Sequence, residues 1–206
     1  MKKIYLTIGV LFSLALVWCQ SNIDLKENGD TTTNITTSEN WDWGNDTIIE
    51  KKSNDNLNNT RIYENKTNNF SFEFDSWRTF QEDKYWFTTI VFAPVDDGIK
   101  ENVWIAVQNL QKTLSIQEYA QETINKLKET VKWFQEIKNE DISINWLNWK
   151  TIIYEYQEWE VNIKAQQTFL ITENNTVYII NYTATSKTFD KFINWVETIL
   201  NSFTLN

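Results

Sequence analysis

Residues 150–185 read KTIIYEYQEWEVNIKAQQTFLITENNTVYIINYTAT, and this stretch carries the clearest signal for the fold class. Runs of β-branched and aromatic residues predict three strands here, at Lys150–Gln157, Val161–Thr172 and Thr176–Thr185. The joints between the runs are short and polar, and Asn174-Asn175 is typical of a hairpin turn. Joints this short connect antiparallel neighbours, so the stretch predicts an antiparallel sheet.

Alternation and composition predict further strands earlier in the chain. Phe70, Phe72 and Phe74 alternate with polar residues, which is the period of a half-buried strand. Other apolar runs predict strands at Trp86–Ala93, Asn102–Leu110 and Ile142–Trp146. Within the second of these runs we expect one face to carry Val103, Ile105 and Val107.

Two segments have the period of amphipathic helices instead. Ser115 and Glu118 form a capping box, in which each side chain accepts a hydrogen bond from the backbone of the other residue. Apolar residues then recur at spacings of mostly three and four as far as Val131, and a similar pattern runs from Phe189 to Phe203. The order strands, helix, strands, helix predicts an α+β sandwich: one mostly antiparallel sheet with helices packed on it.

The N-terminus has the pattern of a bacterial lipoprotein signal. Lys2 and Lys3 precede the uncharged run Ile4–Val17, whose 14 residues suit a signal peptide and are too few to span a bilayer. We therefore interpret residues 1–18 as a signal peptide and Cys19, the one cysteine of the chain, as the site of lipidation. An uncleaved signal anchor and a secreted protein without lipid are the alternatives. Trp18 departs from the pattern, which has a small residue before the cysteine.

Several acyl chains such as palmitate on Cys19 would make a stable membrane anchor. The expected location is the outer face of the cytoplasmic membrane, or the periplasm or outer membrane of a bacterial cell envelope. Residues 19–59 are rich in Asn, Thr, Asp and Ser and predict a flexible tether, followed by one folded domain at 60–206. The net charge of −9 argues against a nucleic-acid partner.

Tryptophan and glycine occur in unusual numbers, 11 and 4. Glycine ordinarily makes up about 7% of the residues of a protein, which is several times its share in this chain. Tryptophan also stands at polar breaks and turn-like positions where glycine is favoured, namely Trp41, Trp43, Trp146, Trp149 and Trp159. We hypothesise that the gene's own organism reads UGA as glycine. The alternative is a protein truly rich in Trp, such as a carbohydrate binder with stacking surfaces.

Few residue types remain that could carry chemistry. The chain has no His, so nucleophiles activated by His and zinc sites built on His are excluded. Asp96, Asp97 and Glu101 around Gly98 are a candidate calcium site, but they miss the EF-hand spacing, and a solvated turn is the favoured interpretation. The sequence therefore predicts no catalytic, cofactor-binding or metal-binding residues.

Several short motifs occur in the order of a known family. They are YEN at 63–65 followed by FSF at 70–72, KENV at 100–103 before a strand, the helix opened by Ser115, and LNSF at 200–203. LNWK at 147–150 matches a turn in which the family has glycine at the position of Trp149. From about Thr60 onward, the chain resembles PsbP-like domains, in particular bacterial lipoproteins and periplasmic proteins related to DcrB.

This resemblance implies an α/β/α sandwich around an antiparallel sheet, and it implies no particular reaction. Plant members are extrinsic subunits of photosystem II that assist retention of calcium and chloride, whereas bacterial members are mostly envelope proteins. Family metal sites that use His cannot carry over to a chain without His. We expect a non-enzymatic accessory lipoprotein that binds a membrane-protein complex or a small ligand. The alternative is an envelope hydrolase or carbohydrate-binding protein that uses carboxylates and aromatics.

Overall fold

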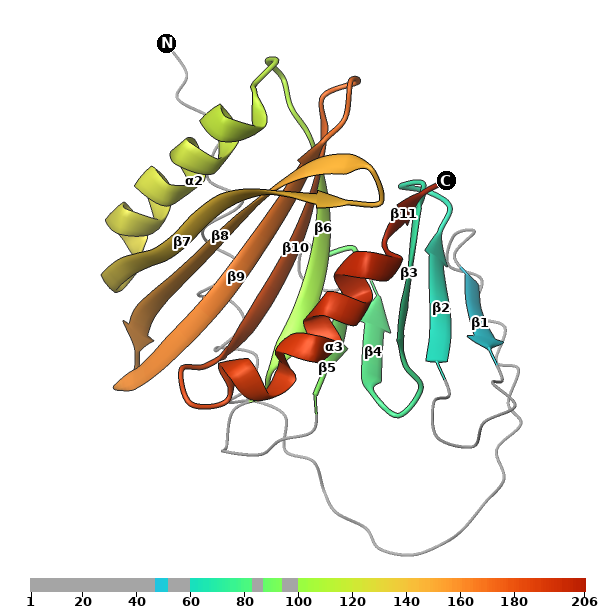
Figure 1. Ribbon diagram of the computed structural model, residues 1–206, viewed down its shortest axis with the longest axis horizontal. Helices are drawn as coiled ribbons and strands as arrows, with labels where there is room; N and C mark the ends of the chain where they lie inside the picture. Colours follow the sequence, from blue (N-terminus) through green and yellow to red (C-terminus); the bar gives the residue numbers. More distant parts are fainter. Residues whose placement is uncertain (1–46, 52–59, 83–86, 94–99) are drawn as a thin grey trace, which may run out of the picture.

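The computed structural model describes residues 47–51, 60–82, 87–93 and 100–206 (Figure 1). The interpreted signal peptide 1–18, Cys19 and the turn at 94–98 lie outside the described residues. So does most of the interpreted tether 19–59. One part of that tether is described: strand β1, Thr47–Lys51, pairs antiparallel with β2. The paired part of the chain therefore begins before residue 60.

The larger sheet has seven strands in the order β4-β5-β6-β10-β9-β8-β7, and every neighbouring pair is antiparallel. The strands are, in sequence order, β4 Thr79–Glu82, β5 Thr89–Phe92, β6 Asn102–Asn109, β7 Lys132–Ile144, β8 Leu147–Glu158, β9 Val161–Ile171 and β10 Thr176–Thr185. The strands predicted at 102–110 and 150–185 are confirmed, including the hairpin at Asn174-Asn175.

A smaller sheet has the order β1-β2-β3-β11. Its other strands are β2 Thr60–Asn65, β3 Phe70–Asp75 and β11 Thr204–Leu205. The alternation predicted for β3 is confirmed, because Phe70, Phe72 and Phe74 are buried while the residues between them are half-buried. Strand β11 follows the last helix and pairs with β3, so the two ends of the domain share one sheet.

Two helices lie on opposite faces of the seven-stranded sheet (Figure 1). Helix α2, Ile116–Thr130, packs over β7, β8 and β9, and its predicted capping box at Ser115 and Glu118 is present. Helix α3, Phe189–Ser202, packs between β10 and β3. This is the predicted α+β sandwich with a mostly antiparallel sheet flanked by helices. None of the helices in the described ranges has the length and apolar character needed to cross a membrane.

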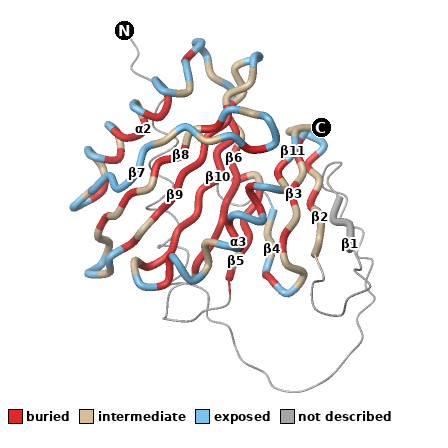
Figure 2. The backbone as a smooth tube through the Cα atoms, viewed as in Figure 1, coloured by how far each residue is buried: buried red, intermediate tan, exposed pale blue. Residues whose placement is uncertain are grey.

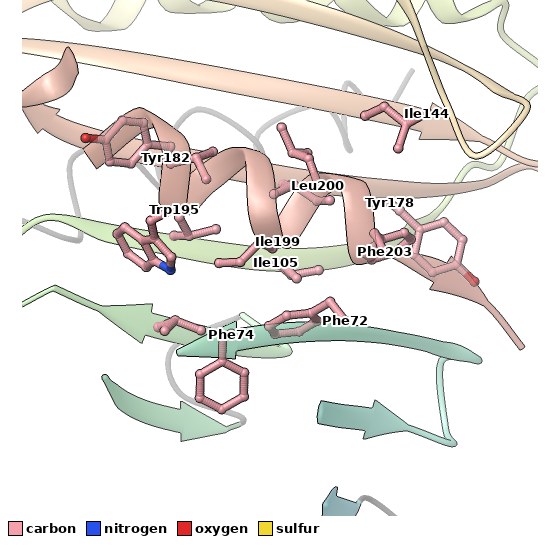
Figure 3. Close-up of a cluster of buried hydrophobic side chains, with 14 of the residues drawn as sticks. Phe72, Phe74, Ile105, Ile144, Tyr178, Tyr182, Trp195, Ile199, Leu200 and Phe203 are labelled. Carbon is pink, nitrogen blue, oxygen red and sulfur yellow. The ribbon is translucent and has the colours of Figure 1, made fainter. Parts of the chain in front are cut away.

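We call the two faces of the large sheet the α2 face and the α3 face. Each face is covered by its own hydrophobic core, and strand β6 contributes to both. Val103 and Ile105 pack on the α3 face, whereas Trp104 and Ala106 pack on the α2 face. Val107 packs with Val103 and Ile105, as the sequence predicted. In Figure 3, side chains of α3 meet those of β3, β6 and β10 in the α3-face core.

The sequence pattern predicted only the end of β7, at Ile142–Trp146. The strand begins at Lys132, and most of it is exposed at the edge of the sheet (Figure 2). Charged residues on an exposed edge strand discourage pairing with other chains, and they also hide the strand pattern. Glu140 and Asp141 also belong to this strand. Asp141 forms an ion pair with Lys150 of β8 over 3.1 Å.

Candidate functional site

The carboxylates of the candidate calcium site are only partly described. Asp96 and Asp97 lie outside the described residues, and Glu101 is 0% exposed just before β6. Within the described ranges, no group of three His, Cys, Asp or Glu side chains could hold a metal ion. Glu155 and Glu158 are half-buried in β8, which is an interior strand of the sheet.

Arg78 is a buried cation in the turn between β3 and β4. Its guanidinium lies 3.8 Å from the ring centroid of Trp195 in α3 and 4.2 Å from that of Trp77. Its Nε donates to Asp75 Oδ2 over 3.0 Å. Burial lowers the pKa of Arg78, although Asp75 and the nearby Glu101 oppose this change. These contacts join the small sheet to α3, which is a structural role.

A second group of polar side chains lies on the α2 face. The cross-strand register places Asn181 of β10 beside Gln167 of β9, and Gln167 beside Ile152 of β8. Residues paired across strands share a face of the sheet. The next row across β6, β10, β9 and β8 consists of Asn102, Thr183, Ala165 and Tyr154.

Tyr156 follows on the same face of β8, beside Ile163. We call Asn102, Gln167, Asn181, Tyr154 and Tyr156 the amide–phenol cluster. All five side chains are buried. They come from four strands of the antiparallel sheet, so their position depends on register and not on any local sequence motif.

Hydrogen bonds fix which amide atoms are available. Asn181 Nδ2 donates to Thr183 Oγ1 over 2.9 Å, and Asn102 Nδ2 donates to the Lys100 carbonyl oxygen over 3.1 Å. This leaves the two Oδ1 atoms as acceptors. Within the described part of the chain, these two atoms, Gln167 Oε1 and the hydroxyls of Tyr154 and Tyr156 are buried without a hydrogen-bond partner.

The cluster is electrically neutral. Burial raises the pKa of Tyr154 and of Tyr156, so both phenols keep their protons. The nearest acid on the same face of β8 is Glu158, whose pKa burial raises to about 7. Amide oxygens accept hydrogen bonds and phenol hydroxyls donate or accept them, so the cluster can bind a neutral polar group.

Sequence reasoning did not single out this cluster. Gln167 and Asn181 stand inside otherwise apolar strand runs, and that interruption is the signal that was present. It could not reveal that both side chains lie together, because lateral register joins residues far apart in sequence.

The family model for DcrB matches residues 88–202, more than half of the chain. The chain belongs to the DcrB family. The resemblance stated from the sequence motifs is thereby confirmed. The DcrB match begins just before β5 and ends at the last residue of α3, so it includes both helices and all five residues of the amide–phenol cluster. No curated protein matches the sequence.

Solved structures share this DcrB-family fold. Cyanobacterial PsbP (CyanoP) from Synechocystis sp. PCC 6803 is 12% identical with a TM-score of 0.53, and the alignment covers 76% of this chain and 98% of that one. LpqN of Mycobacterium tuberculosis is 10% identical with a TM-score of 0.56, covering 78% and 91%. PA94 of Pseudomonas aeruginosa is 13% identical with a TM-score of 0.53, covering 71% and 97%. These similarities concern the fold.

Proposed function

We propose that this protein is a lipid-anchored, non-enzymatic accessory or binding module of the bacterial cell envelope. The observation that carries the proposal is Cys19, the one cysteine of the chain, directly after an apolar run of signal-peptide length. LpqN, which shares the fold, is described as involved in cell envelope biogenesis, and this supports an envelope role. The domain would bind a membrane-protein complex or a small ligand.

The residues of the folded domain also support binding over catalysis. The chain has no His. The described part of the chain brings together no three candidate metal ligands. Its buried polar group, the amide–phenol cluster, consists of neutral amides and phenols that stay protonated. Such groups hold a ligand without transferring protons to it at neutral pH.

Metabolic labelling tests the anchor. Cells expressing the full chain are fed an alkyne analogue of palmitate, and the protein is isolated from the membrane fraction. We expect label on the wild-type chain and none on Cys19→Ser, which should leave the membrane fraction. A Ser13→Ala variant, changed within the apolar run, is the matched control and should label normally. Label that persists on Cys19→Ser would overturn the anchor.

A pull-down from native membranes tests the partner. The full chain, released in mild detergent, should recover the same membrane-protein complex in repeated preparations, and Cys19→Ser should recover less of it. A purified chain that cleaves glycans would overturn the non-enzymatic role.

Exposed tryptophans favour the second candidate function, an envelope carbohydrate-binding protein or hydrolase. Trp133, Trp146 and Trp159 are 79%, 98% and 77% exposed. Exposed indoles can stack on the apolar faces of sugar rings, as aromatic side chains do with other planar or apolar partners. This candidate depends on whether these residues are tryptophan in the organism that carries the gene.

The backbone bears on that question. Trp133, Trp146 and Trp159 have positive φ angles of 58°, 66° and 48°. A residue with a Cβ costs roughly 1–2 kcal/mol in this region, and only glycine enters it freely. Asn145 and Trp146 form the two-residue turn between β7 and β8, where Asn-Gly is the favoured pair. We propose that UGA is read as glycine in this organism and that these three positions are glycine there.

Recoding supports the anchor as well. With glycine at position 18, the signal would end Leu-Val-Gly-Cys, which supplies the small residue missing before Cys19. The test is the gene sequence. We expect UGA at codons 18, 133, 146 and 159, and UGG at all four would overturn recoding. Confirmation would remove the exposed indoles and, with them, the support for the second candidate.

A further inference from the structure

The amide–phenol cluster has no explanation in packing alone. On the α3 face of the same sheet, three buried polar side chains of neighbouring strands bond to each other: Thr151 and Thr168 share a hydrogen bond of 3.0 Å, and Gln166 Nε2 donates to Thr168 Oγ1 over 3.4 Å. On the α2 face, the five polar atoms of the amide–phenol cluster lie in neighbouring rows and have no partner within the described ranges. Buried polar atoms are normally satisfied, so five on one face need a cause.

We propose that the amide–phenol cluster is the binding site for a small, neutral, polyhydroxylated molecule such as a sugar or polyol. The proposal deepens the proposed function, since it rests on the domain being a binding module. It uses buried amides and phenols. It is therefore independent of the exposed tryptophans and of how UGA is read.

The chemistry of the atoms selects the ligand class. The amide oxygens of Asn102, Gln167 and Asn181 accept hydrogen bonds, whereas the hydroxyls of Tyr154 and Tyr156 can also donate them. An ammonium group supplies donors alone, and a carboxylate or phosphate supplies acceptors alone. A hydroxyl group supplies both, so a molecule with several hydroxyls suits a site lined by both amides and phenols.

The surrounding residues agree with a neutral ligand. Phe92 pairs with Asn102 across β5 and β6, and Lys100 Nζ lies 4.4 Å from the centroid of the Phe92 ring. This ammonium disfavours a cation at that end of the cluster, whereas Glu158 at the other end disfavours an anion when ionised. Ala165 and Thr183, between Tyr154 and Asn102 in their row, have short side chains. The row therefore has its two shortest side chains at its centre.

Thermal unfolding with defined probes tests the site. The full chain is purified in a detergent without a sugar headgroup, and Tm is measured with millimolar glucose, N-acetylglucosamine or myo-inositol. Low concentrations avoid the general stabilisation that concentrated sugars give every protein. We expect at least one probe to raise the Tm of the wild-type chain by about 5–10 °C at 100 times its Kd.

Gln167→Met removes one amide oxygen while keeping the volume, and Asn181→Leu removes a second. Both variants should lose the shift by at least half, and Gln167→Met should be at least as stable as the wild-type chain without probe. Thr168→Val, on the α3 face, is the matched control: it should lower Tm and keep the shift. If Asn181→Leu fails to fold, Gln167→Met alone decides.

Absence of a shift with all probes overturns the proposal, and so does an equal shift in the wild-type chain and Gln167→Met. Either result leaves the anchored accessory role standing, because labelling of Cys19 and the membrane pull-down measure that role separately. Conversely, the wild-type chain could take no palmitate label and still show the Tm shift with a probe. That pair of results would overturn the anchor and support the binding site.

Discussion

Asn145 and Trp146 form one turn, and from this turn the Asn145 side chain donates two hydrogen bonds to the C-terminal end of α3. Its Nδ2 donates to the carbonyl oxygens of Asn201 over 3.0 Å and Phe203 over 2.9 Å. Both turn residues have positive φ, 50° at Asn145 and 66° at Trp146. This two-residue turn between β7 and β8 thus anchors the end of the last helix. Asn145 supplies the hydrogen bonds, whereas Trp146 only has to adopt the positive φ.

Replacing Trp146 with glycine should stabilise the chain. Trp146 is 98% exposed, so Trp146→Gly loses little packing and removes the cost of a Cβ at positive φ, roughly 1–2 kcal/mol. We expect Tm to rise by about 2–8 °C in thermal unfolding. Trp146→Ala is the matched control, because alanine keeps the Cβ. An equal rise in both variants would show that loss of the indole, and not the backbone, is the cause.

Replacing Asn145 with glycine should destabilise the chain. Asn145→Gly keeps the positive φ and removes both hydrogen bonds to the end of α3. We expect a loss of about 1–3 kcal/mol, measured by urea unfolding. The control is Asn139→Ala at an exposed position of β7, which should change stability little. Alanine is used there because glycine would itself weaken the strand. No loss in Asn145→Gly would mean that water replaces the two bonds.

Glu158 should make stability depend on pH. Burial raises its pKa in the folded chain to about 7, from an ordinary value of 4.5. Below pH 4.5 the residue is protonated in both states and changes nothing. As pH rises from 4.5 through 7, the unfolded chain releases the proton first, so folding loses stability, and the full penalty is present above pH 7.

Glu158→Gln should therefore raise Tm at pH 8 and leave it nearly unchanged at pH 4, as followed by circular dichroism. The side chain is half-buried, so solvent screens part of the effect and we expect a small Tm shift of a few degrees. Glu197→Gln, at an exposed position on α3, controls for the change in net charge. A rise of equal size at both pH values would contradict the assignment.

Arg78 should not tolerate lysine. Its planar guanidinium lies against the rings of Trp77 and Trp195 and also reaches Asp75. Lysine keeps the charge but has a compact, strongly hydrated head that matches neither ring face. We expect Arg78→Lys to lower stability by about 1 kcal/mol in urea unfolding. Exposed Lys112→Arg is the control, and equal stability of Arg78→Lys and the wild-type chain would mean that charge alone is needed.

The elements that sequence predicted well are those with local causes. Helix α2 is bounded by its capping box and by its apolar period, so its predicted and observed limits agree within a residue. Strand β3 shows its alternation because one face is buried. Strand β7 was mostly missed because its exposed edge carries charges in place of that alternation.

The amide–phenol cluster and the small sheet have non-local causes. Asn102 and Gln167 share the α2 face in adjacent rows only through the register of β6, β10 and β9. Strands β1 and β11 have two to five residues each and gain their stability from neighbours. No pattern within such short segments could predict their pairing, which tertiary context decides.

The pairing of β11 with β3 has a consequence for how the domain comes into being. Thr204 lies beside Ser71, and the Asn206 amide donates to the Asn69 carbonyl oxygen over 3.0 Å. A chain emerging from the ribosome shows β3 long before β11 exists. One edge of β3 must wait until more than a hundred further residues have been synthesised. Completion of the small sheet is therefore among the last steps of folding, and a growing chain stays open to chaperones until β11 has emerged.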